Sequence, residues 1–229
     1  MAESVLPQST NTVTPPRWHV LVLLIAFPLA YWLNAFTPWS YQFFVKRDHS
    51  YFIPFGAAVC LLHWASACFA LWSMRKIGAR PRDIGLHISA GRILVLMATV
   101  VAIGAALIAA RQRWPIHTVP PSDFTFFYPF TLPERCFFVF MALSAGICEE
   151  IVYRGYAITA LEGRGWRTWQ AVVLAAISFV FMHGIASLFL FPFLIVVGLV
   201  YGWLFLWRKS LTPLIWLHCL FDLMAVVAI

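Results

Sequence analysis

The feature that most constrains the fold of this chain is a series of seven apolar runs, each close to the length that crosses a bilayer. They lie near 18–36, 51–74, 93–110, 134–161, 168–186, 188–207 and 211–229. A membrane-spanning helix needs about 20 apolar residues. Hydrophobic residues make up 62% of the 229-residue chain and charged residues 11%, against about 45–50% and 25% in soluble domains. The sequence therefore predicts an all-α, polytopic transmembrane helical bundle of about seven spans.

The distribution of charge predicts how the bundle is oriented. Sixteen Lys and Arg against nine Asp and Glu give a net charge of +7. In a membrane chain this excess reflects basic cytoplasmic loops, and it does not indicate a nucleic-acid partner. When successive loops are assigned to opposite sides of the membrane, ten basic residues lie on the side of the N-terminus and five on the other side. We expect an integral membrane protein with a cytoplasmic N-terminus and the lipid bilayer as its surroundings.

The chain divides into three parts. A polar N-terminal segment occupies 1–17, and 18–133 holds the first transmembrane helices and an interfacial loop. A C-terminal core of further helices occupies 134–229. The loop, 111–133, contains five prolines and a cluster of Phe residues; proline at that density excludes a spanning helix. Whether the loop is a gate or a plain interfacial segment stays open at this point.

The fourth apolar run is interrupted by Glu149, Glu150 and Arg154. Thr131 followed by Glu134 forms a capping box that starts a helix, with a proline in the first turn. No helix-breaking residue follows until the glycine-containing sequence at 162–165. We therefore predict one long helix that carries charges at membrane depth.

Ionisable residues inside the membrane are costly and indicate function. A charge at the bilayer centre costs roughly 2.5–3.5 kcal/mol even on the insertion scale. Six such residues lie on three predicted helices, namely Glu149, Glu150, Arg154, His183, His218 and Asp222. So many are not needed to fix helix packing, and we interpret them as a functional site.

The spacing of these residues assigns partners. Residues i and i+4 share a helix face, so Glu150 can pair with Arg154, and His218 with Asp222. Glu149 is turned about 100° away from that pair on an ideal helix of 3.6 residues per turn, and is left without a partner. This leaves it free to act as a general base. Counted from the helix ends at about 1.5 Å per residue, the groups differ in depth by roughly 13 Å, so the spacing alone does not show that they converge.

Hydrolysis is the economical chemistry for this set of residues. Glu149 and His183 can hold and deprotonate a water, while His218 can donate to the oxyanion that forms on the attacked carbonyl. In the alternative, Glu149, His183 and His218 bind zinc and leave one position open. No HExxH motif is present, so we favour activation of water without a metal or other cofactor. His63 stands alone in the second span, and we interpret it as a packing or interhelical hydrogen-bond residue.

Three short motifs follow one another on successive predicted helices. They are EExxxR at Glu149–Arg154, FxxxH at Phe179–His183 and HxxxD at His218–Asp222. In this order and in a polytopic chain, they resemble the CPBP family, the CAAX-processing and bacteriocin-processing intramembrane proteases of the Abi group. The resemblance covers about 134–229.

The resemblance implies an intramembrane endopeptidase whose core lies in that C-terminal part. Glu149 and His183 correspond to the residues that activate water in this family, and Glu150, Arg154 and Phe179 correspond to supporting positions. The family has been described both as metal-dependent and as glutamate-type, so the resemblance leaves the zinc question open. The compact chain is similar to prokaryotic members, which suggests a location in the cell (inner) membrane and a membrane-associated peptide or protein as substrate.

The last motif departs from the family pattern. His218 and Asp222 correspond to the pair that stabilises the oxyanion, but many members have Asn where this chain has Asp222. An ionised Asp222 would repel an oxyanion, so it must be protonated or must hold His218 as an imidazolium. An alternative function is that of a non-catalytic membrane immunity factor or scaffold that keeps the motifs for packing. A proton or ion pathway is disfavoured because the ionisable groups lie in one depth zone and form no chain across the bilayer. The oligomeric state is not given by the sequence.

Overall fold

The computed structural model describes residues 14–87, 89–114, 125–184, 188 and 190–227, and the regular structure of these residues is helical throughout. In the N-terminal half the elements are α1 (Arg17–Leu21), η1 (Val22–Ala26), α2 (Phe27–Asn34), α3 (Pro38–Phe44), η2 (His49–Tyr51), α4 (Phe52–Lys76), η3 (Pro81–Ile84) and α5 (Ala90–Arg113). In the C-terminal half they are η4 (Thr125–Phe127), α6 (Leu132–Glu149), η5 (Glu150–Ile158), α7 (Thr159–Glu162), α8 (Thr168–Met182), α9 (Phe191–Arg208), α10 (Thr212–Leu223) and η7 (Met224–Val226).

Within the described residues, seven apolar helical segments correspond to the seven predicted spans. Five are long and apolar enough to cross a membrane, namely Arg17–Asn34, His49–Lys76, Gly91–Arg113, Leu132–Glu162 and Phe191–Arg208. Two shorter apolar segments, Thr168–Met182 and Thr212–Val226, complete the set. The predicted all-helical membrane bundle is thus confirmed.

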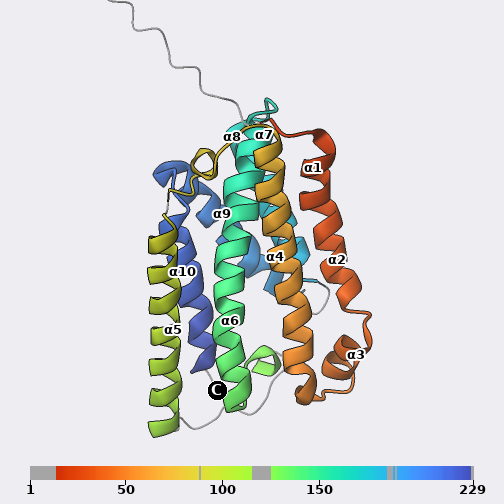
Figure 1. Ribbon diagram of the computed structural model, residues 1–229. Coiled ribbons are helices and arrows are strands. Elements are labelled where there is room, and N and C mark those ends of the chain that lie inside the picture. The colour runs from red at the N-terminus through yellow and green to blue at the C-terminus, as the bar shows by residue number, and fades with distance from the viewer. Residues whose placement is uncertain (1–13, 88, 115–124, 185–187, 189, 228–229) are drawn as a thin grey trace, which may run out of the picture.

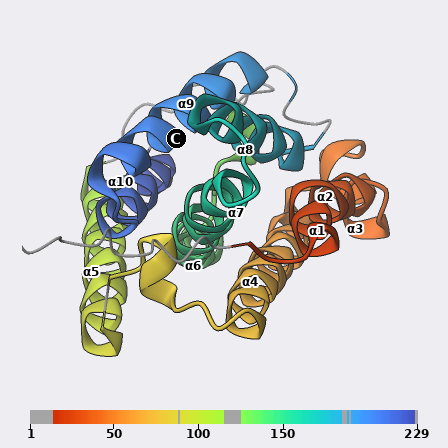
Figure 2. The same ribbon diagram turned by 90° about the horizontal axis from the view of Figure 1, so that it is seen from above.

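The helix that carries the charges forms the centre of the bundle. Figures 1 and 2 show α6 in the middle, and it packs against α4, α5 and α10. Within its most apolar window, 61% of the Leu132–Glu162 segment is buried, against 22–33% for the other four long segments. The charges of the fourth run are therefore enclosed by protein. The first helix, α1, starts at one end of the bundle and α10 ends at the other (Figure 1).

The fourth run is one continuous helical segment, as predicted. Thr131 accepts a hydrogen bond from the backbone of Glu134, whose carboxylate accepts one from the backbone of Thr131, so the predicted capping box is present. The segment ends at Glu162, followed by Gly165 with a positive φ of 84°. The sequence did not reveal that η5, which starts at Glu150, has π-helical hydrogen bonds; such stretches are frequent at functional sites.

Glycines allow two pairs of helices to approach closely. A Cβ on Gly198 would lie 3.0 Å from the Ala176 Cβ, and a Cβ on Gly202 would lie 2.7 Å from a methyl group of Val172. The Gly198–Gly202 sequence therefore packs α9 against α8, in agreement with the small-residue pattern of membrane helices. Between α6 and α10, a Cβ on Gly146 would collide with the Cys219 Sγ.

Parts of the predicted N-terminal segment and loop fall outside the described residues, namely 1–13 and 115–124, which include Pro115, Pro120 and Pro121. The described end of the loop joins an aromatic cluster in which Phe126 packs with Phe43 and Phe52. The division of the chain at 17 and 133 stays a prediction, as does the choice between a gate and an interfacial loop.

Candidate active site

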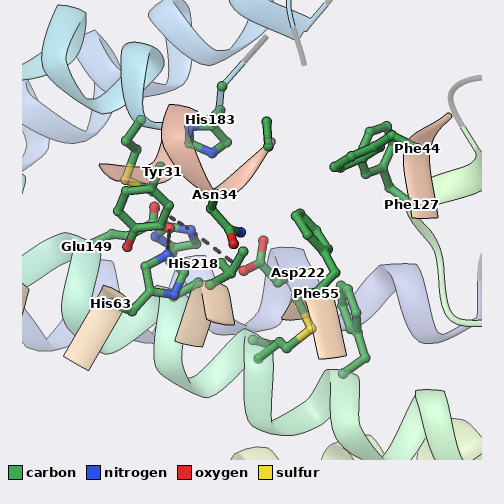
Figure 3. A pocket seen from close by; sticks show the side chains of 18 residues that line it. Tyr31, Asn34, Phe44, Phe55, His63, Phe127, Glu149, His183, His218 and Asp222 are labelled. Carbon is green, nitrogen blue, oxygen red and sulfur yellow. Dashed lines mark ion pairs between the residues drawn. The ribbon is translucent and has the colours of Figure 1, made fainter. Parts of the chain in front are cut away.

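A cavity of about 260 Å³ lies beside the centre of α6. Its polar end is formed by Tyr31, Asn34, His63, Glu149, His183, His218 and Asp222, and its other walls are mainly apolar. Figure 3 shows Glu149, His183, His218 and Asp222 facing this space, with Phe44 and Phe127 at the end away from Glu149. The four residues predicted to be catalytic thus line one cavity, although their estimated depths differ.

Glu149 has a partner that the sequence did not reveal. The His63 Nε2 lies 3.0 Å from the Glu149 Oε1, and the His218 Nε2 lies 3.7 Å from the Glu149 Oε2. The expectation that Glu149 is unpartnered is therefore wrong, because it considered only neighbours on the same helix. His63 does make an interhelical contact, as predicted, but with a site residue. Its position as an ionisable residue in the middle of a span was a signal that could have included it in the site.

Glu150 contacts two other site residues and does not line the cavity. The predicted ion pair is present, with Arg154 Nη1 at 3.2 Å from Glu150 Oε1. The same oxygen is 2.8 Å from the His218 Nδ1. Glu150 is fully buried and Arg154 is 2% exposed. Because Glu150 accepts from the Nδ1–H of His218, the Nε2 of that ring is directed toward Glu149 and the cavity.

Phe179 connects the buried arginine with the histidine that follows α8. The Arg154 guanidinium lies 4.3 Å from the centroid of the Phe179 ring, a cation–π distance. The backbone oxygen of Phe179 is 2.8 Å from the His183 Nδ1. When Nδ1–H donates to this oxygen, Nε2 of His183 carries the lone pair. This tautomer suits His183 to accept a proton or to hold a water.

Asp222 completes the polar end of the cavity. Its Oδ2 lies 3.7 Å from the His218 Nε2, one helical turn away on α10. This is an ion-pair distance and is too long for a direct hydrogen bond. His218 is therefore surrounded by three carboxylates, those of Glu149, Glu150 and Asp222.

The first transmembrane segments contribute residues that sequence reasoning missed. Tyr31 and Asn34 of α2 line the cavity, and the Tyr31 ring lies 5.5 Å from the His63 ring. Neither residue carries a charge or belongs to a motif, so no pattern in the sequence singled them out. Cys148 and Cys219 are buried with free thiols and do not line the cavity.

The predicted zinc alternative requires three ligands around one point. Among the residues that the structure describes, no group of three His, Cys, Asp or Glu side chains is arranged to hold a metal ion. Glu149, His183 and His218 therefore do not form a ready ligand set, and no step below uses a metal. Whether the protein depends on a metal stays a prediction.

Comparison with known proteins identifies the part of the chain that contains these motifs. No curated protein and no solved structure matches the chain. Residues 131–224, however, match a family model whose description is "Type II CAAX prenyl endopeptidase Rce1-like". This match confirms the resemblance to the CAAX-processing membrane proteases.

Proposed function

We propose that the protein is an intramembrane endopeptidase that hydrolyses a peptide bond of a membrane-associated protein or peptide. The observation that supports this most is the cavity itself. Glu149, His183, His218 and Asp222 come from three helical segments of the family-matched region and line the same space. Ionisable groups at membrane depth that face one cavity are typical of a functional site.

In the proposed reaction, a water lies between the Glu149 Oε2 and the His183 Nε2. Glu149 accepts a proton from this water as its oxygen attacks the carbonyl carbon of the substrate. The tetrahedral intermediate then collapses with breakage of the C–N bond. The proton held by Glu149 passes to the departing nitrogen, so Glu149 ends the cycle as a carboxylate.

His218 is proposed to stabilise the oxyanion. Its Nδ1 is engaged by Glu150, so a second proton on Nε2 makes the ring an imidazolium that donates into the cavity. Three carboxylates within 4 Å stabilise this positive charge. In this arrangement Asp222 acts through His218 and does not contact the oxyanion, which accounts for an acidic residue where many relatives have Asn.

The apolar walls suggest how a substrate is accommodated. Phe44, Phe55, Phe127 and Met141 also line the cavity, and Phe44 and Phe127 lie at the end away from Glu149 (Figure 3). An extended segment with apolar side chains fits such walls, and a charged segment does not. We propose that the substrate reaches Glu149 along this side, in the inner membrane of a prokaryotic cell, with the N-terminus of the enzyme in the cytoplasm.

The proposal is tested by mass spectrometry of protein termini in membranes of cells that produce the wild-type chain, Glu149→Ala or Glu149→Gln. The matched control is Glu162→Gln, which alters a carboxylate at the end of α7 that bonds Thr168. We expect a set of new termini that appears with the wild type and the control and disappears with both Glu149 variants at equal membrane levels. Termini that persist in a folded Glu149→Gln protein would refute the proposed reaction, and a biological effect that also persists would favour the scaffold.

A further inference from the structure

We infer that His63 is a positioning residue that holds the Glu149 carboxylate in the geometry needed to activate water. This inference rests on the proposed function. His63 lies on α4, outside the 131–224 segment that matches the family model. The N-terminal helices would then contribute a residue that positions Glu149, in addition to residues that line the cavity.

The two oxygens of Glu149 have different surroundings. Oε1 is 3.0 Å from the His63 Nε2, an ion-pair contact that lacks the alignment of a hydrogen bond. Oε2 makes no hydrogen bond to any residue that the structure describes, and its nearest ionic partner is the His218 Nε2 at 3.7 Å. A carboxylate held at one oxygen cannot rotate freely, so the other oxygen keeps one direction. Glu149 lines the cavity in which the proposed water lies (Figure 3).

His63 is buried, and its surroundings limit its movement. It is 5% exposed, and the Tyr31 ring of α2 packs against its imidazole. The neighbouring residue, Trp64, donates from Nε1 to the Ser144 Oγ at 3.0 Å. This bond ties α4 to α6 one and a half turns before Glu149, and it fixes the register of the two helices. The packing of α4 on α6, which this bond supports, brings His63 and Glu149 into contact.

A residue that only fills space and a residue that positions a carboxylate respond differently to substitution. Leucine retains apolar volume in α4 but cannot donate to the Glu149 Oε1. Glutamine places an amide N–H near the position of the histidine Nε2 and can donate to the same oxygen. A positioning role therefore predicts loss of turnover with His63→Leu and recovery with His63→Gln.

His19 provides a matched control. It is 3% exposed, lies in the first span, and contacts the Ser73 Oγ at 2.7 Å with its Nδ1, outside the cavity. His19→Leu thus removes a buried histidine and its hydrogen bond from the same half of the bundle. Any general effect of such a loss on folding or insertion appears in this variant as well.

The experiment measures how fast each Glu149-dependent terminus forms after expression is induced. It compares full-length wild type, His63→Leu, His63→Gln, His19→Leu and Glu149→Gln at matched membrane levels, with thermal unfolding in detergent as the folding check. Removal of a residue that orients a reacting group can cost up to about 100-fold in activity when that group moves by about 1 Å. We expect that loss for His63→Leu, rates within a few fold of wild type for His63→Gln, and unchanged rates for His19→Leu.

Each other outcome rejects the inference in a distinct way. Wild-type rates in His63→Leu mean that His63 is a packing residue. Equal loss in folded His63→Leu and His63→Gln means that the imidazole takes part in proton transfer and does not merely hold Glu149. Equal loss in His19→Leu means that the effect is general. Termini that persist in Glu149→Gln reject the proposed function, and the inference with it, whatever the His63 variants do.

Discussion

Replacement of Gly146 by alanine tests whether the spacing of α6 and α10 sets the geometry of the site. A Cβ at this position would lie 3.0 Å from the backbone nitrogen of Cys219 and 3.3 Å from the backbone oxygen of Ile215. The Cys219 side chain can rotate away, but the two backbone atoms move only with the whole helix. Ordinary van der Waals separation of about 3.5–4.0 Å requires α10 to shift by roughly 0.5–1 Å.

This shift acts directly on the site because of where Gly146 lies. Glu149 follows it by one turn of α6, and His218 precedes Cys219 on α10. A misplacement of 1 Å can reduce turnover about 100-fold, and overpacking of a close contact costs about 1–3 kcal/mol. We therefore expect Gly146→Ala to slow the formation of Glu149-dependent termini by up to about 100-fold and to lower thermal stability in detergent.

Gly91→Ala is the matched control, because a Cβ on this glycine of α5 meets nothing within 4 Å. It should cut at the wild-type rate and be at least as stable as the wild type, since alanine is the better helix former. Wild-type cleavage and stability in Gly146→Ala would refute the reasoning, because they would show that α10 can move without disturbing the site.

Two further predictions concern charge and metal. Glu150→Gln should lower the free energy of unfolding by about 3–5 kcal/mol, because it leaves the buried Arg154 uncompensated, and it should stop cleavage because His218 is released. Thermal unfolding measures the first effect and terminus counts the second, and Glu162→Gln should change neither. A stable, active Glu150→Gln would contradict the role of this ion pair. Treatment of isolated membranes with EDTA should leave the formation of termini unchanged, with a zinc-dependent peptidase as the positive control, whereas a loss that added zinc restores would establish a metal-dependent reaction.

Much of the fold followed from local patterns in the sequence. Each apolar run fixes one helix because an isolated span must satisfy its own backbone hydrogen bonds. The capping box at Thr131 and Glu134 fixed the start of the central helix, and the glycines after Glu162 fixed its end. The pair of Glu150 and Arg154 followed from their spacing. All of these features depend on residues within a few turns of one another.

The contacts between helices that are distant in sequence could not be obtained in this way. The depth of each residue in its span did not show that His218 and Glu149 meet, because depth carries no information about which helices are neighbours. His63 was set aside for the same reason. Its partner lies 86 positions further along the chain, as the numbering shows, and only the packing of α4 on α6 brings the two together. The π-helical stretch from Glu150 was also not predictable, since its residues have no distinctive pattern.

The pairing of the charges explains how a bilayer protein can hold so many of them in its second half. A single ionised side chain at this depth carries the full cost of desolvation, but Glu150 is held by both Arg154 and His218, and the Glu149 Oε1 by His63. Arg154 and the two histidines each lie within ion-pair distance of one carboxylate oxygen. The Glu149 Oε2 remains without a hydrogen bond among the described residues. The Glu150 Oε2 is also without one, but Glu150 does not line the cavity, so Glu149 is the carboxylate that the proposed reaction can use.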